Sequence, residues 1–185
     1  VVEIGWVDII TKVSKMASQM AAPQENHLDA LLHMFGFLKI NHNLRMAYDP
    51  LYPTIDMSAF KECDWKQFYG DVKEAIPSNA PEPRGKEVDL RMYVDSDHAG
   101  EKRTRRSRTG YFIFLNTALV QWFSKQQATI ETSVFGAEFV AMKLGMESLR
   151  GLRYKLRMMG VEIDNPSYIY VDIMSVIHNT QRPES

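Results

Sequence analysis

Three acidic residues stand where they could do chemistry together. In "YVDSDHAG", residues 93–100, an apolar run leads into Asp95 and Asp97 and then stops at a glycine; "GAEF" places Glu138 in the first turns of a helical segment, and "YIYVD" ends in Asp172. Converging carboxylates repel one another unless cations neutralise them, so such a cluster indicates a divalent metal. Oxygen ligands without a set of cysteines or histidines favour magnesium or manganese over zinc.

The segments around these acids predict a mixed α/β sheet. "VDLRMYVDS" alternates, "TGYFIFLN" is rich in aromatic and branched residues, and "ALVQWFS" follows after a short turn, so we expect an antiparallel meander. The expected elements are three antiparallel strands within Val88 to Leu115 and Ala118 to Ser124, a helix from Ser133 to at least Met146, and a strand from Ser167 to Val171 parallel to the first. With the helix that "IMSVIHNT" begins, the order is β-β-β-α-β-α.

This topology predicts that the three acids meet. The carboxyl ends of neighbouring parallel strands lie at one edge of a sheet, and a helix packed across them can aim one side chain at the same spot. Asp95 ends the first strand, Asp172 ends the fourth, and Glu138 lies on the helix. We therefore expect Asp95, Glu138 and Asp172 to converge.

The rest of the chain divides into two further parts. Apolar residues recur at helical spacing from Val7 to Leu38, interrupted by Pro23, which predicts a hairpin of two amphipathic helices within residues 1–47. Residues 48–87 hold five of the chain's eight prolines and are interpreted as a connector. The α/β domain then occupies residues 88–185.

Composition limits the function classes. With 185 residues, 45% of them hydrophobic and 24% charged, the chain can bury a proper core. It has no apolar run long enough to cross a membrane and no signal-peptide pattern, so we expect an intracellular protein without membrane contact. Cys63 is the single cysteine, which excludes an internal disulfide and a cysteine metal cluster.

The charge is unevenly placed although the net charge is only -1. "EKRTRRSR" packs five basic residues into eight positions: Lys102, Arg103, Arg105, Arg106 and Arg108. Because this run directly follows the first strand, near the expected acid cluster, we interpret it as a loop that binds nucleic-acid phosphates. The alternative is a solvated loop without a ligand.

Taken in order, these motifs resemble the ribonuclease H domain of copia-type retrotransposon polyproteins. The resemblance rests on "YVDSDHAG", "RSRTGYFIFLN", "VQWFSKQQATIETSVFGAEFVAM" and "YIYVDIMSV", and it covers residues 88 to about 180. It implies a ribonuclease H-like mixed sheet of the five-stranded type. "HLDALLHMFGFLKINHNLRMAYDP" is similar to the helical end of the neighbouring reverse transcriptase, which makes residues 48–87 the tether. The paired-aspartate motif of the polymerase is absent, so we expect no polymerase activity.

The resemblance also implies roles. Asp95, Glu138 and Asp172 become the first, second and third metal ligands and the catalytic residues. The implied reaction is hydrolysis of the RNA strand of an RNA/DNA hybrid during reverse transcription, with two Mg²⁺ or Mn²⁺ ions roughly 4 Å apart. The implied partners are the hybrid and the rest of the reverse transcriptase polyprotein, in the cytoplasm, a virus-like particle or the nucleus.

Two departures from the family pattern predict an impaired nuclease. The family has Asn-Gln after the third acid where this chain has Ile173 and Met174, which removes two polar groups from the surroundings of the metal. The family's fourth acidic position falls beyond Ser185. Two other classes therefore stay open: a catalytically decayed nucleic-acid-binding module, and a structural module of a polyprotein.

Other polar residues near the acids are assigned simpler roles. We expect Asp97 to cap the turn at Gly100 and not to bind metal directly. His98 and His178 are interpreted as solvated or hydrogen-bonded surface residues, although either could shuttle protons.

Overall fold

The structure is a computed structural model that describes residues 6–49, 51–60, 64–71 and 73–182. Cys63 lies outside these ranges. The helices are α1 Ile10–Ser18, α2 Glu25–Ile40, α3 Lys66–Tyr69, α4 Val134–Met158 and α5 Met174–Thr180, with 3-10 turns at Val7–Ile9 and Met57–Ala59. The strands are β1 Leu90–Asp97, β2 Arg108–Leu115, β3 Ala118–Gln126 and β4 Tyr168–Tyr170.

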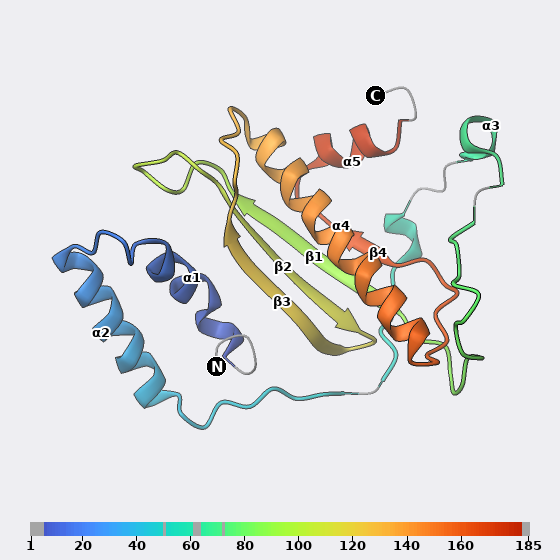
Figure 1. Ribbon diagram of the computed structural model, residues 1–185, viewed down its shortest axis with the longest axis horizontal. Coiled ribbons are helices and arrows are strands. Elements are labelled where there is room, and N and C mark those ends of the chain that lie inside the picture. Colours follow the sequence, from blue (N-terminus) through green and yellow to red (C-terminus); the bar gives the residue numbers. More distant parts are fainter. Residues whose placement is uncertain (1–5, 50, 61–63, 72, 183–185) are drawn as a thin grey trace.

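The strands form one mixed sheet in the order β3-β2-β1-β4 (Figure 1). β1 pairs antiparallel with β2, β2 pairs antiparallel with β3, and β4 runs parallel to β1. The element order β-β-β-α-β-α is confirmed, as are the antiparallel meander, the long helix and the parallel fourth strand. The sheet has four strands in the described part of the chain, where the resemblance implied a sheet of the five-stranded type.

One face of the sheet forms the core with α4. Leu90, Met92 and Val94 alternate along β1 and are at most 5% exposed, because their side chains point at the helix. A Cβ on Gly145 of α4 would lie 2.8 Å from the Met92 side chain, so the glycine allows the helix to approach this closely. The spacing between α4 and β1 is therefore set at Gly145, about two helical turns from Glu138.

The N-terminal helix α1 lies beside β3, and α2 lies beyond α1, away from the sheet (Figure 1). Ser14 on α1 donates a hydrogen bond of 2.6 Å to the Ser124 carbonyl of β3. α2 leaves this contact and turns an apolar stripe outward, since Leu28, Leu32 and Phe35 are more than half exposed. Among the helices in the described ranges, none combines the length and apolarity needed to cross a membrane.

A buried arginine holds the chain that leads into β4. Arg153 on α4 is 8% exposed and donates hydrogen bonds to the carbonyls of Ile163 and Asn165 and to the Ser167 hydroxyl. It also pairs with Glu74 of the connector at 3.0 Å. Arg153 therefore fixes the segment from which β4 starts, and so the position at which β4 ends.

We expect Arg153→Leu to lower the free energy of unfolding by about 1–3 kcal/mol, because buried carbonyl groups lose their donor. Chemical denaturation of the variant and the wild type measures the difference. Arg150→Leu removes an exposed arginine one turn away and is the matched control, with little expected change. Equal stability of the Arg153→Leu variant and the wild type would show that β4 is held by other contacts.

Candidate metal centre

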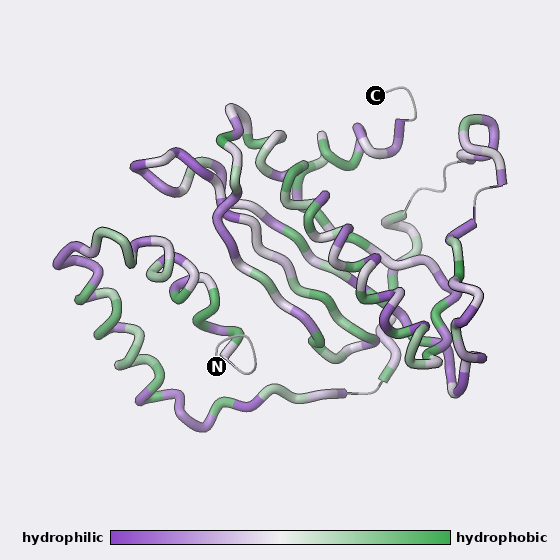
Figure 2. The backbone as a smooth tube through the Cα atoms, viewed as in Figure 1, coloured by the Kyte–Doolittle hydropathy of each residue, from purple (hydrophilic) through white to green (hydrophobic). Residues whose placement is uncertain are grey.

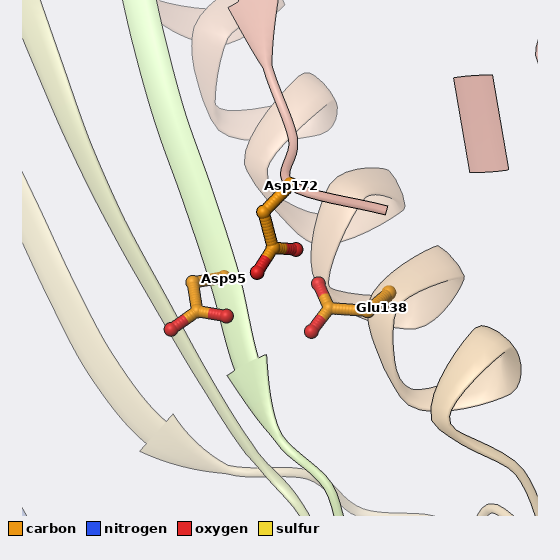
Figure 3. Close-up of side chains that lie close together, drawn as sticks. All are labelled: Asp95, Glu138 and Asp172. Carbon is orange, nitrogen blue, oxygen red and sulfur yellow. The ribbon is translucent and has the colours of Figure 1, made fainter. Parts of the chain in front are cut away.

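Asp95, Glu138 and Asp172 come together at the carboxyl edge of the sheet (Figure 3). A carboxylate oxygen of each lies within 4.8 Å of the other two. Asp95 and Asp172 both stand two residues beyond the pair Tyr93–Tyr170, the last one between β1 and β4, and β1 itself continues to Asp97. Beyond Tyr170, no strand of the described ranges covers this edge of β1, and the three side chains meet in that notch.

Glu138 reaches the notch from α4. The helix begins after Ser133, whose hydroxyl accepts a hydrogen bond from the Gly136 amide at 3.0 Å and caps the helix. Glu138 is only 2% exposed. Its Oε1 accepts hydrogen bonds from the amide of Ser96 at 3.0 Å and from the Ser96 hydroxyl at 3.1 Å. Ser96 thus holds one oxygen of the carboxylate and fixes the direction of the other.

The second oxygen, Oε2 of Glu138, is buried and has no hydrogen-bond partner among the described residues. Burial raises the pKa of Glu138, the hydrogen bonds from Ser96 counteract this in part, and the negative charges of Asp95 and Asp172 raise it further. A buried carboxylate oxygen without a partner is costly, and a divalent cation is the ligand that would remove the cost. The donor set consists of oxygens only, which fits Mg²⁺ or Mn²⁺.

Asp95 and Asp172 are both exposed, in contrast to Glu138. A buried third ligand and two exposed ones leave the solvent side of the cluster open. A bound cation would therefore stay accessible to water and to a substrate phosphate, as in catalytic sites that keep open coordination positions.

Asp97, His98 and His178 take no part in the cluster. Asp97 accepts a 2.5 Å hydrogen bond from the Arg108 amide, lies 3.7 Å from the Lys15 ammonium and packs against Gly100, so it holds the base of the loop. His98 lies 3.3 Å from the Glu131 carbonyl, and His178 is exposed on α5.

The residues after Asp172 open α5. Ile173 stands at the N-cap of this helix and provides no side-chain hydrogen bond to it, and Met174 is 60% exposed. Neither side chain can offer a polar group to a metal ligand. Asp172 is nevertheless carried to the cluster by the backbone that leaves β4.

The basic run forms the loop between β1 and β2, which is strongly hydrophilic in Figure 2. Lys102, Arg103, Arg105 and Arg106 are exposed. Arg108 differs: it is 7% exposed, lies at the start of β2, and its guanidinium donates to the Ser14 hydroxyl of α1. Four of the five basic side chains are thus accessible to a ligand, while Arg108 joins the loop base to α1.

The loop shares a cavity of about 350 Å³ with the N-terminal helices. Its lining includes Lys102, Arg103 and Arg106 of the loop and Lys15 of α1. Lys15 was not among the candidate residues, because it is distant in sequence and sits in an ordinary amphipathic helix. No local signal in the sequence indicates that α1 lies beside the loop.

Comparison with known proteins connects the chain to retrotransposons. It is 26% identical over 178 residues to the retrovirus-related Pol polyprotein from transposon RE1 of Arabidopsis thaliana, which is 95% of this chain and 10% of that protein. The retrovirus-related Pol polyprotein from transposon TNT 1-94 of Nicotiana tabacum is 29% identical over 93 residues, or 50% of this chain and 7% of that protein. An uncharacterized mitochondrial protein of Arabidopsis thaliana is 34% identical over 61 residues, or 33% of this chain and 25% of that protein.

These relatives support a function derived from a retroelement, in the context of a larger Pol polyprotein. The chain spans about a tenth or less of the two polyproteins. No protein-family model matches it, and no solved structure matches it.

The cluster predicts that Asp95→Asn raises stability in the absence of divalent ions and removes the stabilisation by magnesium. Without divalent ions, Asp95→Asn should stabilise the protein, because it relieves repulsion among the carboxylates. Magnesium at ten times its Kd should stabilise the wild type by about 1.4 kcal/mol and leave Asp95→Asn unchanged. Thermal melts over a magnesium titration measure both effects. Asp164→Asn, which changes an exposed acid outside the cluster, should behave as the wild type. An equal magnesium response in all three proteins would contradict a metal centre here.

Proposed function

We propose that this chain is a ribonuclease H-type nuclease of a retrotransposon polyprotein, which hydrolyses the RNA strand of RNA/DNA hybrids with the help of divalent metal. The observation that carries the proposal is the buried Glu138, whose Oε2, unpartnered among the described residues, faces the same notch as the exposed Asp95 and Asp172. The relatives named as retrovirus-related Pol polyproteins support it independently.

Each part of the site has a task in this reaction. Asp95, Glu138 and Asp172 would hold the metal, which when bound supplies activation of water and stabilisation of the leaving oxygen. Ser96 keeps Glu138 in place, so this carboxylate is oriented before a substrate arrives. The exposed loop cations follow the strand that carries Asp95, where they can bind the phosphates on either side of the reacting phosphate. These cations are Lys102, Arg103, Arg105 and Arg106.

A second candidate is a catalytically decayed module that binds nucleic acid without cleaving it. It is favoured by Ile173 and Met174, which give the metal ligands no polar support. The two candidates share the binding surface and differ in turnover. We therefore expect slow cleavage from a site whose ligands are present and whose surroundings are incomplete.

The cleavage test uses a hybrid with a labelled RNA strand and an excess of protein, so that one slow turnover is visible. We expect magnesium-dependent cleavage, and we expect Glu138→Gln to lower its rate by more than about 100-fold. A loss of about 100-fold is the upper limit for residues that only hydrogen-bond to a metal ligand, so a larger loss indicates that Glu138 is itself a ligand. Ile173→Asn should raise the rate, since it places a polar group beside Asp172.

The two variants separate the candidates. Cleavage that survives Glu138→Gln would place the reaction elsewhere. Magnesium binding and hybrid binding without any cleavage, in the wild type and in Ile173→Asn, would establish the decayed module.

The basic loop should supply salt-sensitive affinity. Changing Arg103, Arg105 and Arg106 together to alanine should weaken hybrid binding and flatten its dependence on salt, by about 0.9 in the slope for each phosphate that the loop no longer neutralises. Binding measured by fluorescence anisotropy at several salt concentrations gives this slope. Lys143, Arg150 and Lys155 are exposed basic residues of α4 and provide a control of equal charge when changed to alanine. The same slope in the wild type and the loop variant would make the run a solvated loop.

A further inference from the structure

The sheet face opposite α4 has a trough of about 470 Å³ that opens beside the metal centre. Tyr93 of β1 and Phe112 of β2 form part of its lining, and Ile10 of α1 borders it. Asp95 and Asp172 line the same trough. One cavity therefore joins an aromatic surface to two of the three carboxylates that would hold metal.

The aromatic surface is held in place and still accessible. The Tyr93 ring stacks on Tyr170 with centroids 4.7 Å apart and planes at 11°, and it makes a T-shaped contact with Phe114 at a centroid distance of 5.8 Å. Tyr93 nevertheless stays 41% exposed, and Phe112, its partner in the β1–β2 register, stays 39% exposed. A ligand that stacks here would cost the protein little side-chain entropy, because the Tyr93 ring is already fixed by its neighbours.

Gly110 keeps the trough open next to the acids. It lies opposite Asp95 in the β1–β2 register. A Cβ at this position would have its nearest neighbours at 3.9 and 4.0 Å, both backbone oxygens, so the residue could carry a side chain without a clash. The glycine is therefore not required by packing here, and its lack of a side chain leaves space between Asp95 and Phe112.

A ligand that suits both ends of the trough combines a planar ring with a group that binds metal. An apolar protein segment in the same place would bury Asp95 and Asp172 against it, at a large desolvation cost. A nucleotide has a base for the aromatic surface and a phosphate for the metal centre. Bases inside a duplex already have both ring faces covered, so the base in question is unpaired.

We propose that the trough binds an unpaired nucleobase, stacked on Tyr93 and Phe112, of a nucleotide whose phosphate lies at the metal centre. This inference rests on the proposed function for the position of the phosphate. It adds a nucleotide with an unpaired base, such as one at a frayed end or an overhang, to the ligands that the hybrid-cleaving site accepts.

The probe is a single-stranded DNA tetranucleotide that contains a fluorescent adenine analogue, in magnesium, so that no RNA is present to be cleaved. Stacking should quench its fluorescence on binding. Phe112→Leu, which keeps an apolar side chain and removes the ring, should weaken binding about tenfold, as expected when one base stack is removed. Phe112→Tyr keeps an aromatic ring and should bind the probe as well as the wild type does.

Gly110 provides a second, independent variant. Gly110→Val fills the trough with a side chain that suits a strand and should abolish quenching, whereas Gly110→Ala should keep most of it. Tyr154→Leu removes an exposed tyrosine ring of α4 outside the trough and should have no effect. Thermal melts show whether each variant is folded.

The outcomes separate this inference from the proposed function. A wild type that binds magnesium and cleaves hybrid but does not quench the probe overturns the inference alone. Equal binding by Phe112→Leu and Phe112→Tyr, with loss only in Gly110→Val, would indicate an apolar site for a protein segment and also overturns it. Absence of magnesium binding overturns the proposed function, and the inference with it.

Discussion

The candidate site depends on one carboxylate that the fold takes out of water. Glu138 is almost fully buried, and among the described residues Ser96 satisfies only one of its two oxygens. The charged form of such a group is unfavourable without a partner, and two neighbouring aspartates make it more so. The fold tolerates this because the surrounding packing positions the helix: Gly145 allows α4 to lie close against Met92, and the Ser133 cap starts the helix just before Glu138. A metal ion would offset the cost that the protein's own packing imposes on this carboxylate.

The second constraint is that β4 is short. It pairs with β1 over three residues and, within the described ranges, leaves the last part of β1 unpaired on that edge. Continued by two residues, the register that pairs Tyr93 with Tyr170 sets Asp172 level with Asp95, and the chain that leaves β4 keeps both carboxylates at the notch with Glu138. Arg153 fixes the start of β4 from the opposite end of the sheet. The position of Asp172 after β4 is therefore linked to the hydrogen bonds that Arg153 makes before β4.

Sequence reasoning predicted the elements whose signals are local. Alternation indicated the strands of the meander, and the acids at the ends of two strands indicated Asp95 and Asp172, because strand direction and pleat are encoded within a few residues. The prediction that Glu138 joins them also required the parallel pairing of the first and fourth strands. Ser96, Lys15 and the aromatic trough were missed. Each depends on contacts between segments far apart in the chain: Ser96 with α4, Lys15 with the basic loop, and Tyr93 with Tyr170. Nothing in the spacing of these residues distinguishes them from ordinary strand and helix residues.

The position of Asp172 does not depend on the side chains that follow it. It is the last residue before the N-cap of α5, so the backbone that leaves β4 places it regardless of which side chains follow. Ile173 and Met174 can therefore change the polarity around the proposed metal site without moving Asp172. Glu138 is likewise oriented by Ser96 on β1 and not by positions 173 and 174. A chain of this kind can lose polar groups beside the cluster and keep the three carboxylates that would bind an ion, because the two are held by different parts of the fold.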